Sequence, residues 1–267
     1  MTPRIGKRKT SYFLPVLTLC QRELVRFYRQ RSRIIGVIAS PLVFWFLIGS
    51  GLSGSFSHPS APPSINYLEY FFPGTIILVI LFTSIFSTIS IIEDRREGFL
   101  QSVIVAPIPR SSIALGKILG GTFLALLQGI IFMLLAPFLG ISLNIVSLSL
   151  ILSILFVISF GLTGLGFVIA WRMDSTQGFH AVMNLFLIPM WLLSGALFPS
   201  SGATHWLSTV MAFNPLSYGI AALRQALYLN GHIVTRDLSP LPINFLVTVG
   251  FAILTFCLST YLVRKQH

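Results

Sequence analysis

The sequence predicts an all-α polytopic membrane protein with six transmembrane helices. Of its 267 residues, 54% are hydrophobic and only 9% are charged, whereas a soluble domain carries about 25% charged residues. Uncharged runs long enough to cross a bilayer recur along the chain. The net charge of +11 would suggest a nucleic-acid partner in a soluble protein, but here the basic residues flank apolar runs. We therefore expect a membrane lipid environment and no nucleic acid.

Residues 1–33 are predicted to form a basic cytoplasmic segment with an interfacial helix. Nine of the 18 Lys and Arg residues lie here. From Val16 apolar residues recur every third or fourth position while arginines occupy other faces, which is typical of a helix lying on a membrane surface. A cleavable signal peptide is disfavoured because the apolar stretch from Tyr12 to Cys20 is short and contains Pro15.

Residues 34–267 are predicted to form one six-span domain. The spans are expected at about 34–52, 70–92, 118–140, 146–171, 178–198 and 241–263. The uncharged run from Ile118 to Trp171 is about twice the length of one crossing, so it should hold two spans with a turn near Asn144. The loop 93–117 joins the second and third spans.

The outer segment 199–240 is expected to be re-entrant. It is apolar but is broken at Asn214 and Pro215, so it should form two short helices, Ala203–Phe213 and Leu216–Leu229. Neither can cross a bilayer, and together they would dip into the outer leaflet and return.

Charge distribution favours six spans with the N and C termini cytoplasmic. In this arrangement 16 of the 18 basic residues lie on the inner side and only Arg224 and Arg236 lie outside. A seventh span through Trp206–Leu229 would move Arg264 and Lys265 outside, which the positive-inside rule disfavours.

Catalytic and metal chemistry are not indicated. Gly51–Gly54 places Ser53 in a G-x-S-G pattern that resembles the nucleophile of rhomboid proteases, but no later span offers an obvious partner histidine. The histidines lack ligand spacing, so no metal site is expected. His180 and Asn184 are interpreted as packing or interfacial groups. An intramembrane serine protease using Ser53 and an ATP-independent channel remain the alternative functions.

The chain also lacks a nucleotide-binding loop and a disulfide framework. Gly116–Lys117 could end the pattern G-x-x-x-x-G-K-[ST], but positions 111 and 118 are Ser and Ile. We therefore expect no cofactor in this chain, and ATP and Mg²⁺ would belong to a partner. Cys20 and Cys257 fall in different predicted compartments.

The most informative segment is Glu93–Lys117. Mixed charges end the second span, and Glu93 and Glu97 share one helix face. The apolar stretch Phe99–Ala106 and the stiff Pro107–Pro109 follow. A charged helix followed by rigid apolar surface favours docking of a cytoplasmic partner.

Several motifs together resemble the membrane subunits of ATP-binding-cassette exporters of the second type, in the branch of daunorubicin-resistance and nodulation-factor export permeases. The stretches that carry the resemblance are Tyr70–Gly74 with Pro73 and Gly74, the inner loop Glu93–Gly98 with Pro107, Arg110, Gly116 and Lys117, the fifth-span ending Leu193–Gly195 with Phe198–Pro199, and the outer stretch Asn214–Tyr218 with Pro215, continuing to Arg224.

The resemblance implies a non-enzymatic permease dimer, formed with a second copy or a similar paralogue, that binds two cytoplasmic ATPases in a bacterial inner membrane. It places the ATPase-coupling residues Glu93, Asp94, Arg95, Arg96, Glu97 and Gly98 on a coupling helix, with the N-terminal helix as a second contact. The implied cargo is a hydrophobic or amphipathic small molecule, drug or lipid, with a glycan or lipo-oligosaccharide as an open alternative. Gly116 and Gly120 form a G-x-x-x-G pattern, for which packing within one subunit and dimerisation both remain open.

Overall fold

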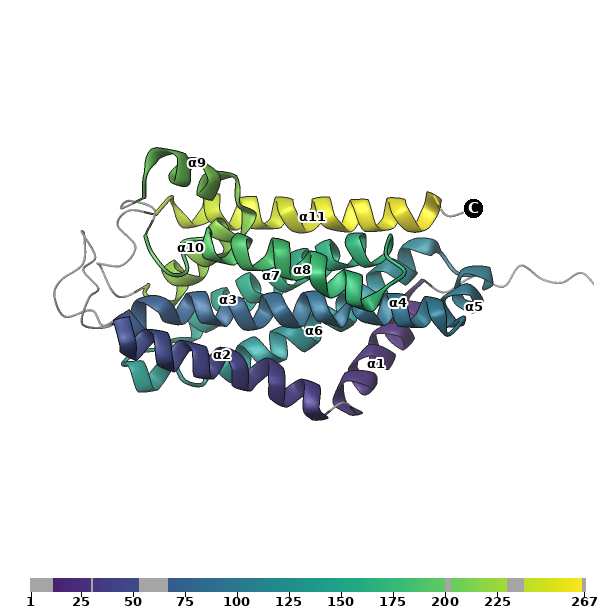
Figure 1. Ribbon diagram of the computed structural model, residues 1–267, viewed down its shortest axis with the longest axis horizontal. Helices are drawn as coiled ribbons and strands as arrows, with labels where there is room; N and C mark the ends of the chain where they lie inside the picture. The colour runs from purple at the N-terminus through teal and green to yellow at the C-terminus, as the bar shows by residue number, and fades with distance from the viewer. Residues whose placement is uncertain (1–11, 30, 53–66, 200–202, 230–237, 266–267) are drawn as a thin grey trace, which may run out of the picture.

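The computed structural model describes residues 12–29, 31–52, 67–199, 203–229 and 238–265, and every regular element in these ranges is a helix. The all-helical prediction is therefore confirmed for the described residues. The bundle is elongated (Figure 1). Helices α1 (Phe13–Arg29) and α5 (Phe99–Val105) lie at one end, together with the C-terminal end of α11 (Leu241–Lys265). We call this the basic end. Helices α9 (His205–Phe213) and α10 (Pro215–Leu227) lie toward the opposite end.

Helix α3 (Tyr67–Ser87) is the centre of the bundle. It packs against α2 (Arg31–Leu52), α6 (Arg110–Met133) and α7 (Ile145–Ala170), and it continues through Thr88 into α4 (Ile89–Arg96). The apolar window of α3 and α4 is 83% buried, whereas that of α11 is 22% buried. A helix that is hydrophobic on every face must be enclosed by protein or lipid. Protein therefore encloses α3, and much of α11 faces outward.

Within the residues that the structure describes, four helices are long and apolar enough to cross a membrane. They are Tyr67–Arg96, Arg110–Met133, Ile145–Ala170 and Leu241–Lys265. Two other expected spans coincide with α2, which contains the shorter apolar helix segment Pro41–Gly51, and with α8 (Thr176–Leu192). At about 1.5 Å per residue, α8 is roughly 26 Å long, close to the thickness of a hydrocarbon core.

The bounds of the third and fifth spans differ most from the sequence prediction. The third span was expected at 118–140, but α6 begins at Arg110 and ends at Met133, before the 3₁₀ turn Ala136–Leu139. Pro137 accounts for the early end because proline cannot donate the next helical hydrogen bond. Helix α7 then begins at Ile145, where the Asn144 side chain accepts a 2.6 Å hydrogen bond from the Ser147 backbone N–H. This capping box fixes the turn where the sequence indicated it.

The fifth span was expected to reach residue 198, but α8 ends at Leu192. The Asn214 Nδ2 donates hydrogen bonds of 2.6 Å to the Met190 carbonyl and 3.0 Å to the Leu193 carbonyl. Unpaired carbonyls at a helix end require such donors. The Asn214 side chain also accepts a bond from the Leu216 N–H and caps α10. One residue thus ends α8 and starts α10, which separates two short helices near the expected bounds.

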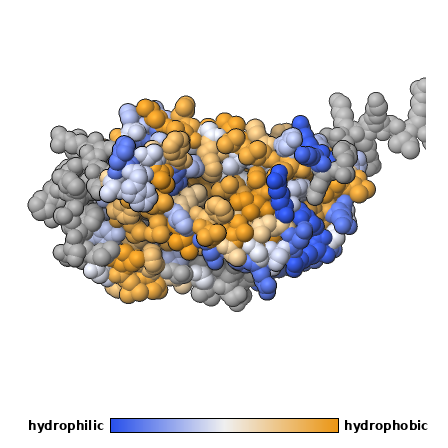
Figure 2. All heavy atoms as spheres, turned by 45° about the horizontal axis from the view of Figure 1, so that its top comes forward, coloured by the Kyte–Doolittle hydropathy of each residue, from blue (hydrophilic) through white to orange (hydrophobic). Residues whose placement is uncertain are grey.

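The inner loop contains a sharp turn between α4 and α5. Gly98 has a φ of +77°, a left-handed conformation that glycine adopts without steric cost. Helix α5 follows at Phe99, and the extended Ala106 and Pro109 lead into α6. The surface changes character along the molecule (Figure 2): hydrophobic atoms cover much of its middle, and strongly hydrophilic atoms gather at the basic end.

Helix α1 packs closely along the first half of α6. A Cβ added at Gly116 would lie 2.8 Å from the Leu19 Cβ and 3.0 Å from the Val16 carbonyl oxygen. A Cβ at Gly120 would lie 2.7 Å from the Glu23 Cβ. The G-x-x-x-G pattern therefore serves packing within one subunit.

We predict that Gly116→Leu separates α1 from α6 and exposes Cys20, which is 9% exposed in the native packing. Burial and the neighbouring Glu23 raise the pKa of the Cys20 thiol, so the native residue should react slowly with maleimide. Overpacking costs about 1 to 3 kcal/mol, so labelling should accelerate roughly tenfold. The measurement uses a Cys257→Ser background.

Gly250→Leu is the matched control, because a Cβ there meets no atom within 4 Å. Equal Cys20 labelling in both variants would contradict the packing role of Gly116.

Candidate functional site

A cluster of buried and half-buried charges joins α1, α4 and α6 at the basic end. We call it the charge cluster. Its members are Arg22, Glu23 and Arg26 from α1, Glu93 and Asp94 from α4, and Lys117 from α6. Three cations face three carboxylates, so the cluster is neutral within itself.

Asp94 is the central acceptor of the charge cluster. It is completely buried, and Arg22 binds it in a bidentate manner with distances of 2.8 and 2.6 Å to its two carboxylate oxygens. Arg26 adds a 2.9 Å bond to Oδ1 and reaches Glu93 at 2.6 Å. The bond to Asp94 raises the pKa of Arg22, so this guanidinium remains charged. Bidentate charge-assisted bonds fix both distance and orientation.

Lys117 connects α6 to both other helices. It is 5% exposed, and its Nζ donates to Glu23, Asp94 and the Ser90 hydroxyl. A buried ammonium needs such partners, because an isolated charge in this environment is costly. Lys117 is therefore fully engaged within the subunit, and its neighbourhood does not fit a nucleotide phosphate.

The other inner-loop arginines bind the connection between α7 and α8. Arg95 donates to the Asp174 carboxylate at 3.1 Å, to the Met173 carbonyl at 3.3 Å and to the Trp171 carbonyl. Arg96 Nε donates to the Asp174 backbone oxygen at 3.0 Å. Residues Glu93 to Arg96 thus make contacts inside the subunit, and the exposed Glu97 and the Gly98 turn lead from them to α5.

Helix α5 packs most of its apolar residues against the bundle and leaves Val105 as its one exposed apolar residue. Leu100 is buried beneath it, whereas Val105 is 84% exposed. The Arg22 guanidinium lies 3.7 Å from the Phe99 ring centroid, which ties the start of α5 to α1. Pro107 follows α5, and Arg110 at the start of α6 donates to the Val263 and Arg264 carbonyls at 3.3 Å. The buried Leu100 and the Arg22–Phe99 contact therefore hold α5, and Arg110 joins α6 to α11.

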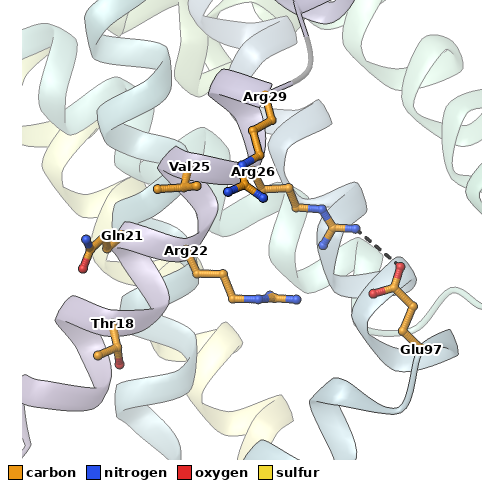
Figure 3. A pocket seen from close by; sticks show the side chains of 7 residues that line it. All are labelled: Thr18, Gln21, Arg22, Val25, Arg26, Arg29 and Glu97. Atoms are coloured by element: carbon orange, nitrogen blue, oxygen red, sulfur yellow. Dashed lines mark ion pairs between the residues drawn. The ribbon is translucent and has the colours of Figure 1, made fainter.

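Two hollows lie beside α1 at this end. One of about 400 Å³ lies between α1 and α5, and its walls include Leu14, Phe99 and Val103. The other, of about 680 Å³, lies along α1 and is lined by three arginines and Glu97 (Figure 3). Figure 3 shows Arg26 reaching across toward Glu97, a pair separated by 3.8 Å. Apolar and charged contact areas are therefore adjacent.

The remaining motif residues meet in a second cluster nearer the opposite end. Arg224 is 3% exposed and donates to the Tyr70 and Gly195 carbonyls at 3.3 and 3.1 Å. Its guanidinium also lies 4.1 Å from the Tyr70 ring centroid. Gly74 accepts a 2.8 Å bond from the Trp191 indole, next to the buried Pro73 inside α3. With Asn214 and Pro215, these contacts join α3, α8 and α10.

Sequence reasoning missed Glu23 as a site residue. It is the only acid of α1, and it lies on the same helical face as the buried Val16, Leu19 and Cys20. An acid on the buried face of a basic amphipathic helix was the available signal. His180 contacts the Phe86 ring, with centroids 5.0 Å apart. Ser53 lies outside the described residues, and within those residues no three His, Cys, Asp or Glu form a metal-binding group.

The family comparison agrees with this geometry. Residues 15–228 match the family described as ABC-2 type transporter. The chain belongs to the ABC-2 type transporter family. It is therefore a transport permease rather than an enzyme, and this family implies association with an ABC ATPase and a dimeric arrangement.

Named relatives cover most of this ABC-2 permease. A putative transport permease ycf38 of Cyanophora paradoxa is 30% identical over 80% of this chain and 75% of its own length. Nodulation protein J of Sinorhizobium fredii is 26% identical over 88% of this chain and 87% of its own. The probable multidrug ABC transporter permease YbhR of Escherichia coli is 24% identical over 58% of this chain and 43% of its own.

We predict that Lys117→Met destabilises the permease because it leaves Glu23 and Asp94 with one cation fewer. Breaking a buried ion pair costs about 3 to 5 kcal/mol. The thermal midpoint in detergent should fall clearly below that of Arg29→Met, which removes an exposed cation from α1. Adding Glu23→Gln should restore part of the loss. Equal midpoints for Lys117→Met and Arg29→Met would show that the cluster contributes no stability.

Proposed function

We propose that this permease forms half of the translocation path of an exporter and receives its driving motion at α5. The observation that carries the proposal is that α5 exposes Val105 and is joined through the Arg22–Phe99 contact to the charge cluster of α1, α4 and α6. A partner that displaces α5 would also displace these helices. The partner supplies ATP and Mg²⁺, and this chain supplies the movable path.

The proposed topology has six spans with both termini cytoplasmic. Helices α2 and α8 supply the first and fifth spans beside the four long apolar helices. The basic end then faces the cytoplasm, in agreement with the positive-inside rule. The pair α9 and α10 is re-entrant from the outer side, where Asn214 and Arg224 hold it against α8 and α3.

The complete transporter contains two permease subunits and two ATPase subunits in a bacterial inner membrane. The second permease is an identical copy or a similar paralogue. Apolar side chains stay exposed on α2 and α8, including Phe46 and Phe186, and these helices therefore offer surface for lipid or a second subunit. The family branch favours a hydrophobic or amphipathic cargo, namely a small molecule, drug or lipid, with a glycan or lipo-oligosaccharide as an alternative.

The first test is docking at α5. Val105→Asp places a charge at the exposed apolar residue of α5, so ATPase recovery should fall while membrane insertion is retained. The measurement is detergent purification of the tagged permease from native membranes, followed by mass spectrometry for a subunit with a G-x-x-x-x-G-K-[ST] loop.

Ile145→Asp is the matched control, since Ile145 is 88% exposed and lies at the start of α7. A negative residue is favourable at a helix N-terminus. Full ATPase recovery with Val105→Asp would refute docking at α5.

Charge reversal should separate the inner-loop residues into two groups. Glu97 has a side chain 61% exposed, so Glu97→Lys should reduce export and stimulated ATPase activity with little change in thermal midpoint. Arg95→Glu should reduce both activity and stability, because it removes the bonds to Asp174 and the neighbouring carbonyls. Full activity of both variants in reconstituted vesicles would count against a coupling role for this loop.

A further inference from the structure

A third hollow at the basic end lies away from α5. It has a volume of about 420 Å³ and is bounded by the end of α4, the connection between α7 and α8, and the last turn of α11. Its lining residues are Arg95, Trp171, Arg172, Asp174, Leu262 and Lys265. Three cations and one carboxylate thus surround one space.

The charges of this hollow are not balanced. Asp174 pairs with Arg95, whereas Arg172 and Lys265 form no ion pair with any residue in the described ranges. Arg172 and Lys265 are both exposed. This differs from the charge cluster, where every cation has a carboxylate partner. The hollow therefore has two cations available for an anionic ligand.

Trp171 lines the hollow and carries an indole N–H that has no hydrogen-bond partner within the part of the chain that the structure describes. The residue is 4% exposed. Buried donors are normally paired. An unpaired donor beside available cations favours a ligand rich in acceptor oxygens, such as a phosphate.

The exposed face of α11 indicates that the ligand also has an apolar part. Leu254, Leu258 and Tyr261 are 57%, 43% and 58% exposed. Their spacing of four and three residues continues with Lys265 four residues later, so all four share one helical face. An apolar stripe thus ends directly at the basic hollow.

We propose that this site binds an anionic phospholipid. The lipid phosphate lies between Arg172 and Lys265, and an acyl chain lies along Leu254, Leu258 and Tyr261. Basic pockets between transmembrane helices on the cytoplasmic side suit anionic headgroups. The assignment to the inner leaflet rests on the topology under the proposed function, whereas binding itself requires only that the chain is a membrane permease.

The test is lipid retention measured by native mass spectrometry of the full chain released from nanodiscs. The nanodiscs contain equal amounts of phosphatidylglycerol and phosphatidylcholine with the same acyl chains. We expect the native chain to retain phosphatidylglycerol, and Arg172→Gln and Lys265→Gln each to weaken retention about fivefold.

Arg29→Gln is the control, because it removes one exposed cation from α1, outside the site. It should weaken retention less than Arg172→Gln or Lys265→Gln does. Leu258→Ser should also weaken retention of the lipid, since it interrupts the acyl-chain stripe. Glycerol phosphate added in excess should not displace the lipid.

Three results would overturn the proposal. They are equal retention of both lipids, equal loss in Arg172→Gln, Lys265→Gln and Arg29→Gln, and displacement by glycerol phosphate alone, which would indicate an anion site without a lipid. Because no ATPase or cargo is present, failure here leaves the exporter function untouched. Likewise, a failure of the ATPase-docking test would not change the result for lipid retention.

Discussion

The structure depends on burying one ammonium, Lys117, between carboxylates from two other helices. Lys117 donates to both Glu23 and Asp94, and leaving any one of these buried groups without an oppositely charged partner would be costly. The three helices are therefore energetically coupled at one point. Close packing at Gly116 and Gly120 brings α1 near enough for this contact.

Under the proposed function, the charge cluster connects the surface helix α5 to the rest of the subunit. Helix α5 contains only seven residues and would be marginal alone. It is supported because the Phe99 ring stacks beneath the Arg22 guanidinium, and Arg22 in turn binds Asp94. Charge-assisted bonds therefore resist displacement of α5 relative to α1 and α4. This is what a coupling element between an ATPase and a transmembrane path requires.

The all-helical class and the positions of most helices could be predicted, because long uncharged runs and their flanking charges are local properties. The helix ends at Met133 and Leu192 were harder to predict from the sequence. The first depends on Pro137, which is visible in the sequence, but the second depends on Asn214, more than 20 residues away. No local pattern reveals such a cap.

Local sequence patterns indicated the candidate site only in part, because its contacts also depend on distant parts of the chain. The charges and prolines of the inner loop indicated a docking surface. Sequence position alone could not tell which of its residues contact the same subunit and which are exposed. Asp94 is completely buried and Glu97 is largely exposed, although only three residues separate them. Their different environments depend on α1, which comes from a distant part of the chain.

The two polar clusters together constrain how a single subunit can move. Near one end Arg224 and Asn214 fasten α10 to α3 and α8, and at the other the charge cluster fastens α1 to α4 and α6. Between them, α7 contacts its neighbours through weaker single bonds, such as the 3.2 Å bond from Ser259 to the Gly164 carbonyl. Separating either end would leave buried charges or carbonyls unpaired, which costs several kcal/mol. Large rearrangement inside one subunit is therefore disfavoured relative to motion of whole subunits against each other. Alternating access in this ABC-2 permease should then come mainly from the subunit interface, with each subunit moving as one body.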